Sequence, residues 1–226
     1  MNNVNNNQSG VTYVYTPETF LQDFAIDSNN NIVVVGSFRG RNVDFDPSAG
    51  VATFNSDIQT QTNPNLSTYK NTGYLWKLNS SGSYVWAGVI KAVSSSFVPS
   101  VDTFPYAITF DANDDFYFSG HFRSQIDLNP GSGTASIFSN GNSDVFIGKF
   151  SGTNNALIWA RSFGGANNVY TNDMRISGNK LLLFGSFVAT IDFDPNSGTQ
   201  SVTSQGVNDS YLLSLTETSF TKCEKF

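Results

Sequence analysis

The chain has 226 residues, of which 39% are hydrophobic and 14% aromatic, so it is long enough to bury one sizeable core. Its formal net charge is −6 and its basic residues form no cluster, which disfavours a nucleic-acid partner because binding to phosphates requires positive charge. No apolar run is long enough for a transmembrane helix, so membrane insertion is not expected. The single cysteine, Cys223, excludes an internal disulfide and a CxxC zinc site.

The remaining composition favours strands over helices. Asn, Ser and Thr are abundant, and their side chains compete with a helical backbone for hydrogen bonds, whereas the Phe-rich apolar runs are short and bounded by Gly, Asn and Asp. Residues 1–10 are mostly polar and lack the charged and apolar regions of a signal peptide, so we expect a flexible N-terminal segment there. The rest of the chain is predicted to form a single all-β repeat domain.

Three units follow in chain order, each with four short predicted strands. The first unit, at about 20–90, has them at 20–27, 31–35, 74–78 and 84–87. The second unit, at about 104–163, has them at 104–111, 115–118, 145–150 and 157–160. The third unit, at about 169–226, has them at 169–177, 180–184, 211–215 and 220–226. The first unit carries extra residues near 57–70, and the connection from it to the second unit carries extra residues near 93–100.

A fixed phrase occurs once in each unit. A Gly-x-Phe at 36–38, 120–122 and 185–187 is followed by Asp-x-Asp-Pro or Asp-x-Asn-Pro at 44–47, 127–130 and 192–195. A phrase that recurs at intervals of tens of residues indicates a repeat architecture, in which each copy is one supersecondary unit stacked on its neighbours. Four strands in each copy are typical of a propeller blade.

These motifs carry a family resemblance. The chain resembles the SBBP-type β-propeller repeats in the order of its motifs, which are Gly-x-Phe, then Asp-Phe-Asp-Pro, then Asn-x-x-Asp-x-Phe-x-x-Lys, then Trp-Ala. The middle copy matches this pattern best, with Asn142, Asp144, Phe146, Lys149 and Trp159. The third copy departs from the pattern, because it has Ser214 in place of the Lys and no Trp. The resemblance covers about residues 20–220. It implies a β-propeller-like fold in a secreted or cell-surface bacterial protein, and it says nothing of an activity.

Three blades fall short of the four to eight that close a propeller. We therefore expect an open arc, or part of a larger or oligomeric propeller, with an unpaired face at each end. Such faces predict self-association or a protein partner that completes the ring. A strand at 11–15 and the charged tail at 222–226 are expected to cover the two end edges.

The repeated acidic turns permit two interpretations. In an extended segment, the paired side chains point to the same side, so each pair together with turn carbonyls can hold Ca²⁺. Alternatively, each Asp caps its own turn, and the Asn of the middle copy favours this interpretation because a metal site would lose one charge there. The residues concerned are Asp44 and Asp46, Asp127 and Asn129, and Asp192 and Asp194. The sequence indicates no other cofactor.

No catalytic constellation emerges. His121 is the only histidine and occupies the place of Ser37 and Ser186 in the repeated phrase, with no nucleophile assigned to it. Trp76 has no counterpart in the other copies, so it is a candidate ligand-binding aromatic as well as a candidate core residue. We therefore expect a non-enzymatic interaction module that binds a protein partner. The alternative is a lectin or glycan-active enzyme that uses acidic and aromatic residues on a blade face.

Overall fold

The computed structural model describes residues 16–59, 68–93, 102–216 and 223–224, and the expected all-β class is confirmed: these residues form strands and no helix. The expected N-terminal segment at 1–10, the strand at 11–15 and most of both insertions lie outside the described residues. The strands are β1 Glu18–Ile26, β2 Ile32–Arg39, β3 Val43–Asp44, β4 Thr53–Phe54, β5 Ile58–Gln59, β6 Thr68–Tyr69, β7 Thr72–Leu78, β8 Tyr84–Ala92, β9 Thr103–Phe110, β10 Phe116–Phe122, β11 Gln125–Asp127, β12 Ser136–Phe138, β13 Asp144–Phe150, β14 Leu157–Phe163, β15 Val169–Ser177, β16 Lys180–Phe187, β17 Thr190–Asp192, β18 Ser201–Thr203, β19 Asp209–Thr216 and β20 Cys223–Glu224.

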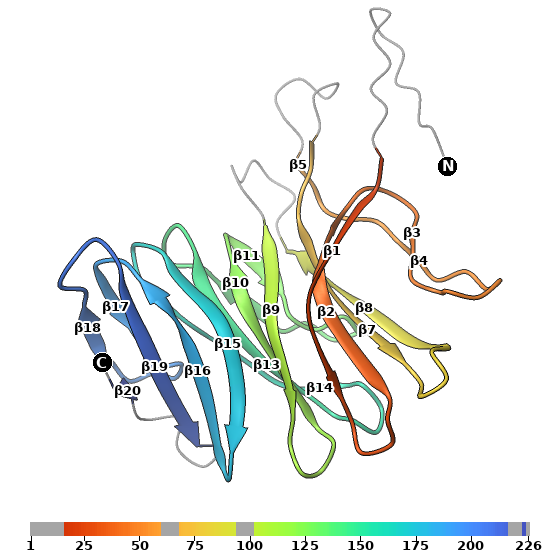
Figure 1. Ribbon diagram of the computed structural model, residues 1–226. Helices are drawn as coiled ribbons and strands as arrows, with labels where there is room; N and C mark the ends of the chain where they lie inside the picture. Colours follow the sequence, from red (N-terminus) through yellow and green to blue (C-terminus); the bar gives the residue numbers. More distant parts are fainter. Residues whose placement is uncertain (1–15, 60–67, 94–101, 217–222, 225–226) are drawn as a thin grey trace, which may run out of the picture.

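Three antiparallel four-stranded meanders lie side by side (Figure 1). The first meander is β1-β2-β7-β8, the second is β9-β10-β13-β14 and the third is β15-β16-β19-β20. Strand β9 lies between β1 and β15 in Figure 1, so the second meander is in the middle and the other two form the ends of the row. The described residues do not close into a barrel or a ring.

Short hairpins connect consecutive meanders. Strands β3–β4, β11–β12 and β17–β18 each follow the second strand of their own meander and carry the acidic turns. Strand β11 pairs with β8 of the preceding meander, with Ile126 opposite Ala92 and Asp127 opposite Lys91. The third hairpin repeats this arrangement through a bridge between Asp192 and Gly164, which directly follows β14. The second unit therefore extends the sheet of the first, and the third unit is joined to the second by a single bridge.

A bulge at the same place in each meander explains the glycine of the repeated Gly-x-Phe. The first strand of every meander has one extra residue next to the position that pairs with that glycine. The resulting bulge brings a carbonyl oxygen of the first strand close to the glycine Cα. A Cβ on Gly120 would clash with the carbonyl oxygen of Phe104. The same clash would occur between Gly36 and Phe20 and between Gly185 and Tyr170. Only glycine permits this close approach of two strands.

The core lies between the meanders, because successive side chains of a strand point to opposite sheet faces. The cluster between the first and second meanders is rich in phenylalanine and includes Val33, Val35, Leu75, Phe116, Phe118, Phe146 and Phe150. The cluster between the second and third includes Tyr117, Ile147, Leu183, Phe187 and Leu213. A further aromatic cluster covers the outer face of the first meander, with Val34, Phe38, Phe45 and Tyr74. Apolar residues thus occupy both faces of the first meander.

Candidate functional site

The acidic turns close their hairpins through hydrogen bonds from the main chain. Oδ1 of Asp44 accepts hydrogen bonds from the N–H groups of Asp46 and Ala52, at 3.0 and 2.9 Å. Oδ1 of Asp46 accepts one from the N–H of Ser48 at 2.8 Å. The other two hairpins repeat this pattern with the acceptors Asp127 and Asn129, and Asp192 and Asp194. The geometry is that of consecutive Asx turns, which Asp and Asn form equally well.

This geometry leaves each acidic pair in its own hairpin. The two N–H donors hold the pKa of Asp44 below its usual value, so its carboxylate is ionised at neutral pH. No group of three or more His, Cys, Asp or Glu residues suited to a metal ion occurs in the described ranges. The Ca²⁺ interpretation therefore remains a hypothesis about one carboxylate pair and its turn carbonyls at a time.

Trp76 lies on β7, within the aromatic cluster on the outer face of the first meander. Its ring centroid is 6.1 Å from that of Phe45, which belongs to the acidic hairpin folded over this face. The side chain is partly buried, and its buried Nε1 has no hydrogen-bond partner among the described residues. Trp76 is thus part of an end face of the row.

Two buried ion pairs stand at the opposite end of the strands from the acidic hairpins. Asp27 lies 3.6 Å from Nζ of Lys77, and Asp111 lies 3.1 Å from Nζ of Lys149. Asp27 and Asp111 open the turns between the first two strands, and their Oδ1 atoms accept hydrogen bonds from N–H groups within those turns. The lysine partners were not expected from the sequence.

The third meander lacks both members of this pair. Ser177 and Ser214 stand at the positions of the acid and the lysine, and its turn is shortened to Gly178 and Asn179. The turns of the first two meanders are also joined by hydrogen bonds, because the N–H and the hydroxyl of Ser28 donate to the carboxylate of Asp114. The shortened third turn offers no carboxylate for an equivalent bond with the second.

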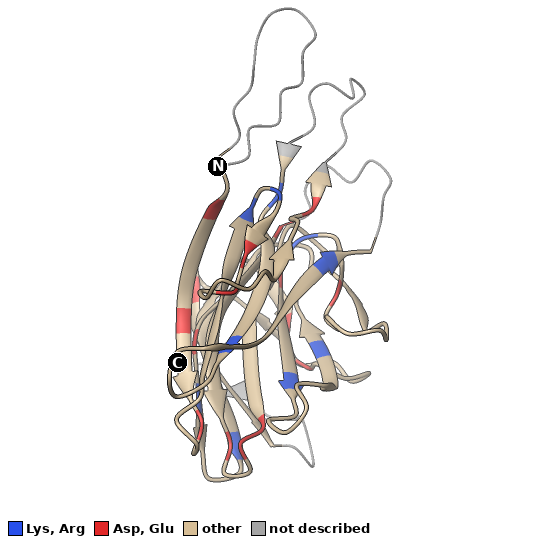
Figure 2. Cartoon of the chain, turned by 90° about the vertical axis from the view of Figure 1, so that its right-hand side faces the viewer, with Lys and Arg blue, Asp and Glu red and all other residues tan. Residues whose placement is uncertain are grey.

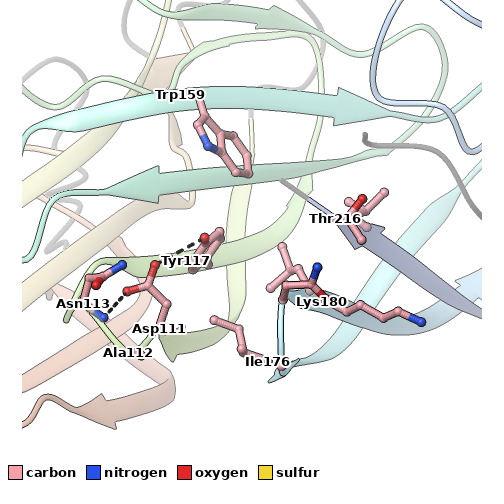
Figure 3. A pocket seen from close by; sticks show the side chains of 12 residues that line it. Asp111, Ala112, Asn113, Tyr117, Trp159, Ile176, Lys180 and Thr216 are labelled. Atoms are coloured by element: carbon pink, nitrogen blue, oxygen red, sulfur yellow. Dashed lines mark hydrogen bonds between the residues drawn. The ribbon is translucent and has the colours of Figure 1, made fainter. Parts of the chain in front are cut away.

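A pocket of about 270 Å³ opens at this place, between the second and third meanders (Figure 3). Trp159 and Tyr117 form an aromatic corner, with ring centroids 5.9 Å apart. Figure 3 shows the indole of Trp159 projecting toward the space between Asp111 and Thr216. The opposite wall is aliphatic and consists of Ile176, Leu181 and Leu215, and the polar residues around it include Asn113, Asn179 and Lys180.

Smaller side chains in the third meander create the pocket. The strand register aligns Ile176, Leu181 and Leu215 with Phe110, Phe116 and Phe150 of the second meander. Those phenylalanines fill the corresponding space beside Trp86, and the rings of Phe116 and Phe150 stack at 5.3 Å. The tryptophan at this place therefore faces a filled core in one interface and a cavity in the other, where Tyr117 stands beside it in the place of Val33. Comparison of the three copies residue by residue contains this signal, but our sequence analysis considered Trp159 only as part of the repeat motif.

His121 lies on β10, close to three aromatic rings. Its ring centroid is 5.1 Å from those of Phe104 and Tyr106 and 4.8 Å from that of Tyr170. Burial lowers its pKa to about 4, so the imidazole is neutral at pH 7. Its Nδ1 has no hydrogen-bond partner in the part of the chain that the structure describes. This environment is that of a packed aromatic side chain.

Asp144 is the buried carboxylate at the start of β13. Its two oxygens accept hydrogen bonds from the N–H groups of Asn140 and Gly165, at 2.8 and 3.4 Å. Burial outweighs these donors and raises the pKa of Asp144 to about 6. The carboxylate thus ties the loop before β13 to the connection between the second and third meanders.

Comparison with known proteins adds no relative. No protein-family model matches the sequence, and no curated protein matches it.

No helix in the described ranges is long and apolar enough to cross a membrane. Basic residues are placed singly along several strands in the view of Figure 2. Within the described residues, the candidate sites are the pocket, the two end faces and the acidic hairpins.

Proposed function

We propose that the chain is a non-enzymatic, propeller-like interaction module that binds another protein through the outer faces of its first and third meanders. Each meander is one blade of an open arc, which lacks the further blades that would close a ring. The partner that fits both faces is a second copy of this chain, because two copies bring six blades. The resemblance of this chain to SBBP-type repeats supports a location outside the cell or at the cell surface.

The observation that carries the proposal is that the end faces expose positions that the inner interfaces bury. Phe24 on β1 is 55% exposed, whereas its counterparts Ile108 and Met174 are 2% and 0% exposed. Phe184 on β16 is 40% exposed, whereas its counterparts Val35 and Ser119 are fully buried. Exposed apolar residues on both ends of a repeat array favour an interaction at those ends.

A polar contact follows the same pattern. Oδ2 of Asp23 on β1 accepts a hydrogen bond from the N–H of Ile108 on the neighbouring meander, at 3.0 Å. Asp173 holds the equivalent position on β15, at the end of the row, and pairs there with Arg175. The equivalent donor on β1 of a second copy is the N–H of Phe24, which donates to Asp23 of its own strand in this structure and would exchange that acceptor for Asp173 in the contact. The third meander thus carries an acceptor of the kind that joins the first two.

The hairpin β3–β4 supplies the matching edge. In the inner interfaces, the acidic hairpin of the later unit extends the preceding sheet, as β11 does on β8. Strand β3 of one copy can extend the fourth strand of the third meander of another copy in the same way. A head-to-tail contact repeated in both directions closes two copies into one ring, which leaves no end face unpaired.

Sedimentation equilibrium of the full chain tests this proposal. We expect a reversible dimer that is lost in Phe24→Asp and in Phe184→Asp, because either charge would be buried in both contacts of the ring. Ile158→Asp is the matched control, since Ile158 is 49% exposed on the middle meander. An equimolar mixture of the two interface variants should regain dimers, because one of its two contacts is unaltered.

Two outcomes would contradict the proposal. A wild-type chain that stays monomeric at high concentration would leave the end faces without a second copy. A dimer that resists Phe24→Asp but not Phe184→Asp would indicate a symmetric contact between two third meanders instead of the head-to-tail ring.

A further inference from the structure

The pocket between the second and third meanders is distinct from the end faces, and it combines an apolar interior with polar side chains around it. Its aromatic corner and aliphatic wall come from strands, whereas Asn113 and Asn179 come from the turns of two neighbouring meanders. An amide side chain both donates and accepts hydrogen bonds. A ligand in this pocket therefore meets apolar surface within and neutral hydrogen-bonding groups around it, the usual arrangement of a small-molecule site.

The carboxylate of Asp111, which lines the pocket, is compensated within the protein. Oδ1 of Asp111 accepts the N–H groups of Asn113 and Asp115, and its Oδ2 lies 3.1 Å from Nζ of Lys149 and 3.5 Å from the hydroxyl of Tyr117. Lys180 is exposed and extends away from the aromatic corner in Figure 3. A charged ligand would gain little from Asp111, which is already paired, or from Lys180, which extends away from the aromatic corner. It would also lose its hydration, so the pocket favours a neutral ligand.

The size of the pocket limits the ligand further. Its volume of about 270 Å³ is slightly below the range typical of drug-sized ligands, roughly 300–1,000 Å³. One six-membered ring with small substituents matches this space. The indole of Trp159 offers an aromatic surface to the C–H face of such a ring, and the amides of Asn113 and Asn179 can bind hydroxyl groups.

We propose that this pocket binds one neutral pyranose ring of a glycan. The apolar C–H face of the sugar packs on Trp159 and Tyr117, and its hydroxyl groups bind the two asparagine amides. The site is independent of self-association, because its lining residues lie between the second and third meanders. Binding there involves no bond cleavage, since Asp111 is engaged by Lys149 and by its own turn.

Ligand-observed saturation-transfer NMR on the full chain tests the site. The probes are the methyl glycosides of glucose, galactose, mannose and N-acetylglucosamine, with methyl glucuronoside and N-acetyltyrosinamide as charged and aromatic comparisons. We expect saturable, millimolar binding of at least one neutral glycoside. Leu215→Phe should weaken that binding at least about tenfold, because it restores the phenylalanine that fills the equivalent space in the neighbouring interface.

Leu21→Phe is the control of equal size, because Leu21 is exposed on β1 and far from the pocket lining. Near-ultraviolet circular dichroism checks that Leu215→Phe is folded, and Ile176→Phe fills the pocket from another strand if it is not. The proposal is overturned if no neutral glycoside binds in a manner sensitive to either filling variant. It is equally overturned if only the aromatic amide or the charged glycoside does.

Discussion

Gly120 shows how one residue fixes the path of two strands. The bulge in β9 brings the carbonyl oxygen of Phe104 to the place that a Cβ of residue 120 would occupy. We expect Gly120→Ala to lower the free energy of unfolding by about 2–4 kcal/mol, since β9 and β10 must separate to admit a methyl group. Urea denaturation measures this change.

Gly206→Ala provides the comparison, because the nearest atom to its added Cβ is the Asp209 Oδ1 atom at 4.0 Å. That variant should change the free energy of unfolding by less than about 1 kcal/mol. Equal destabilisation by the two variants would show that the close approach of β9 and β10 is not what requires glycine at position 120.

Asp144 and His121 give opposite contributions to the pH dependence of stability. The folded-state pKa of Asp144 is raised to about 6 from 3.8, so its proton is retained in the folded state and stability falls as pH rises from about 4 to 6. The folded-state pKa of His121 is lowered to about 4 from 6.5, so stability falls as pH drops from about 6.5 to 4. The two contributions offset each other over much of this range.

Asp144→Asn should separate them. The amide oxygen can keep the shorter of the two hydrogen bonds, that from the N–H of Asn140, and the substitution gives up the longer one from Gly165 and removes the buried charge. At pH 7.5 we expect the variant to be more stable than the wild type by about 1–3 kcal/mol. Below pH 6.5 it should lose stability more steeply with acid, because the contribution of His121 is no longer offset. Thermal melts from pH 4 to 8 measure both effects, and a variant less stable than the wild type at pH 7.5 would contradict the prediction.

At the scale of the elements, the acidic hairpins owe their closure to side-chain acceptors. Asp127→Ala removes an acceptor of two N–H groups, those of Asn129 and Ala135, and we expect it to cost about 2 kcal/mol of unfolding free energy. Asp127→Asn keeps an oxygen in place and should cost less than about 1 kcal/mol. Chemical denaturation of both variants compares them.

Corresponding alanine variants in the first and third hairpins distinguish the turn from a metal site. With the turn interpretation, EDTA and millimolar Ca²⁺ should change the melting temperature of the wild type little. A large Ca²⁺-dependent rise, lost in Asp44→Ala or Asp192→Ala, would instead establish a cation bound at the hairpins.

Some of this structure could be predicted from the sequence, because it depends on local chemistry. The Gly-x-Phe and Asp-x-Asp phrases indicated the repeat, and the strands β2, β10 and β16 lie where short apolar runs end in that glycine. The pairing of β11 with β8 was not predicted, since it joins two units and no local pattern encodes it. The pairing of Lys149 with Asp111 has a trace in the sequence: both members are serine in the third unit.

The pocket was missed for a related reason. Trp159 occupies the place of the packed Trp86, so its own strand predicts a buried aromatic residue. The cavity depends on what faces it, and the facing residues Leu181 and Leu215 are ordinary core residues when read alone. Only the alignment of three units shows that they replace Phe116 and Phe150. Differences between repeats at one interface therefore carry functional information that each repeat alone does not.

At the scale of the whole molecule, the row of three meanders differs from a closed ring by its two unpaired faces. Joining two copies in one chain, from residue 226 of the first to residue 1 of the second, would make their association intramolecular. We expect this tandem chain to sediment as a single species over a wide concentration range. It should melt at a higher temperature than the single chain at micromolar concentration, because linkage provides an effective concentration on the order of millimolar.

The control for the tandem chain carries Phe24→Asp and Phe184→Asp in both copies, which places a charge on every end face. This control should lose the gain in melting temperature while keeping the same chain length. A tandem chain that melts like the single chain, or that forms progressively larger oligomers, would indicate that the two end faces do not fit each other. The three meanders would then be a complete, open unit whose end faces bind a different protein.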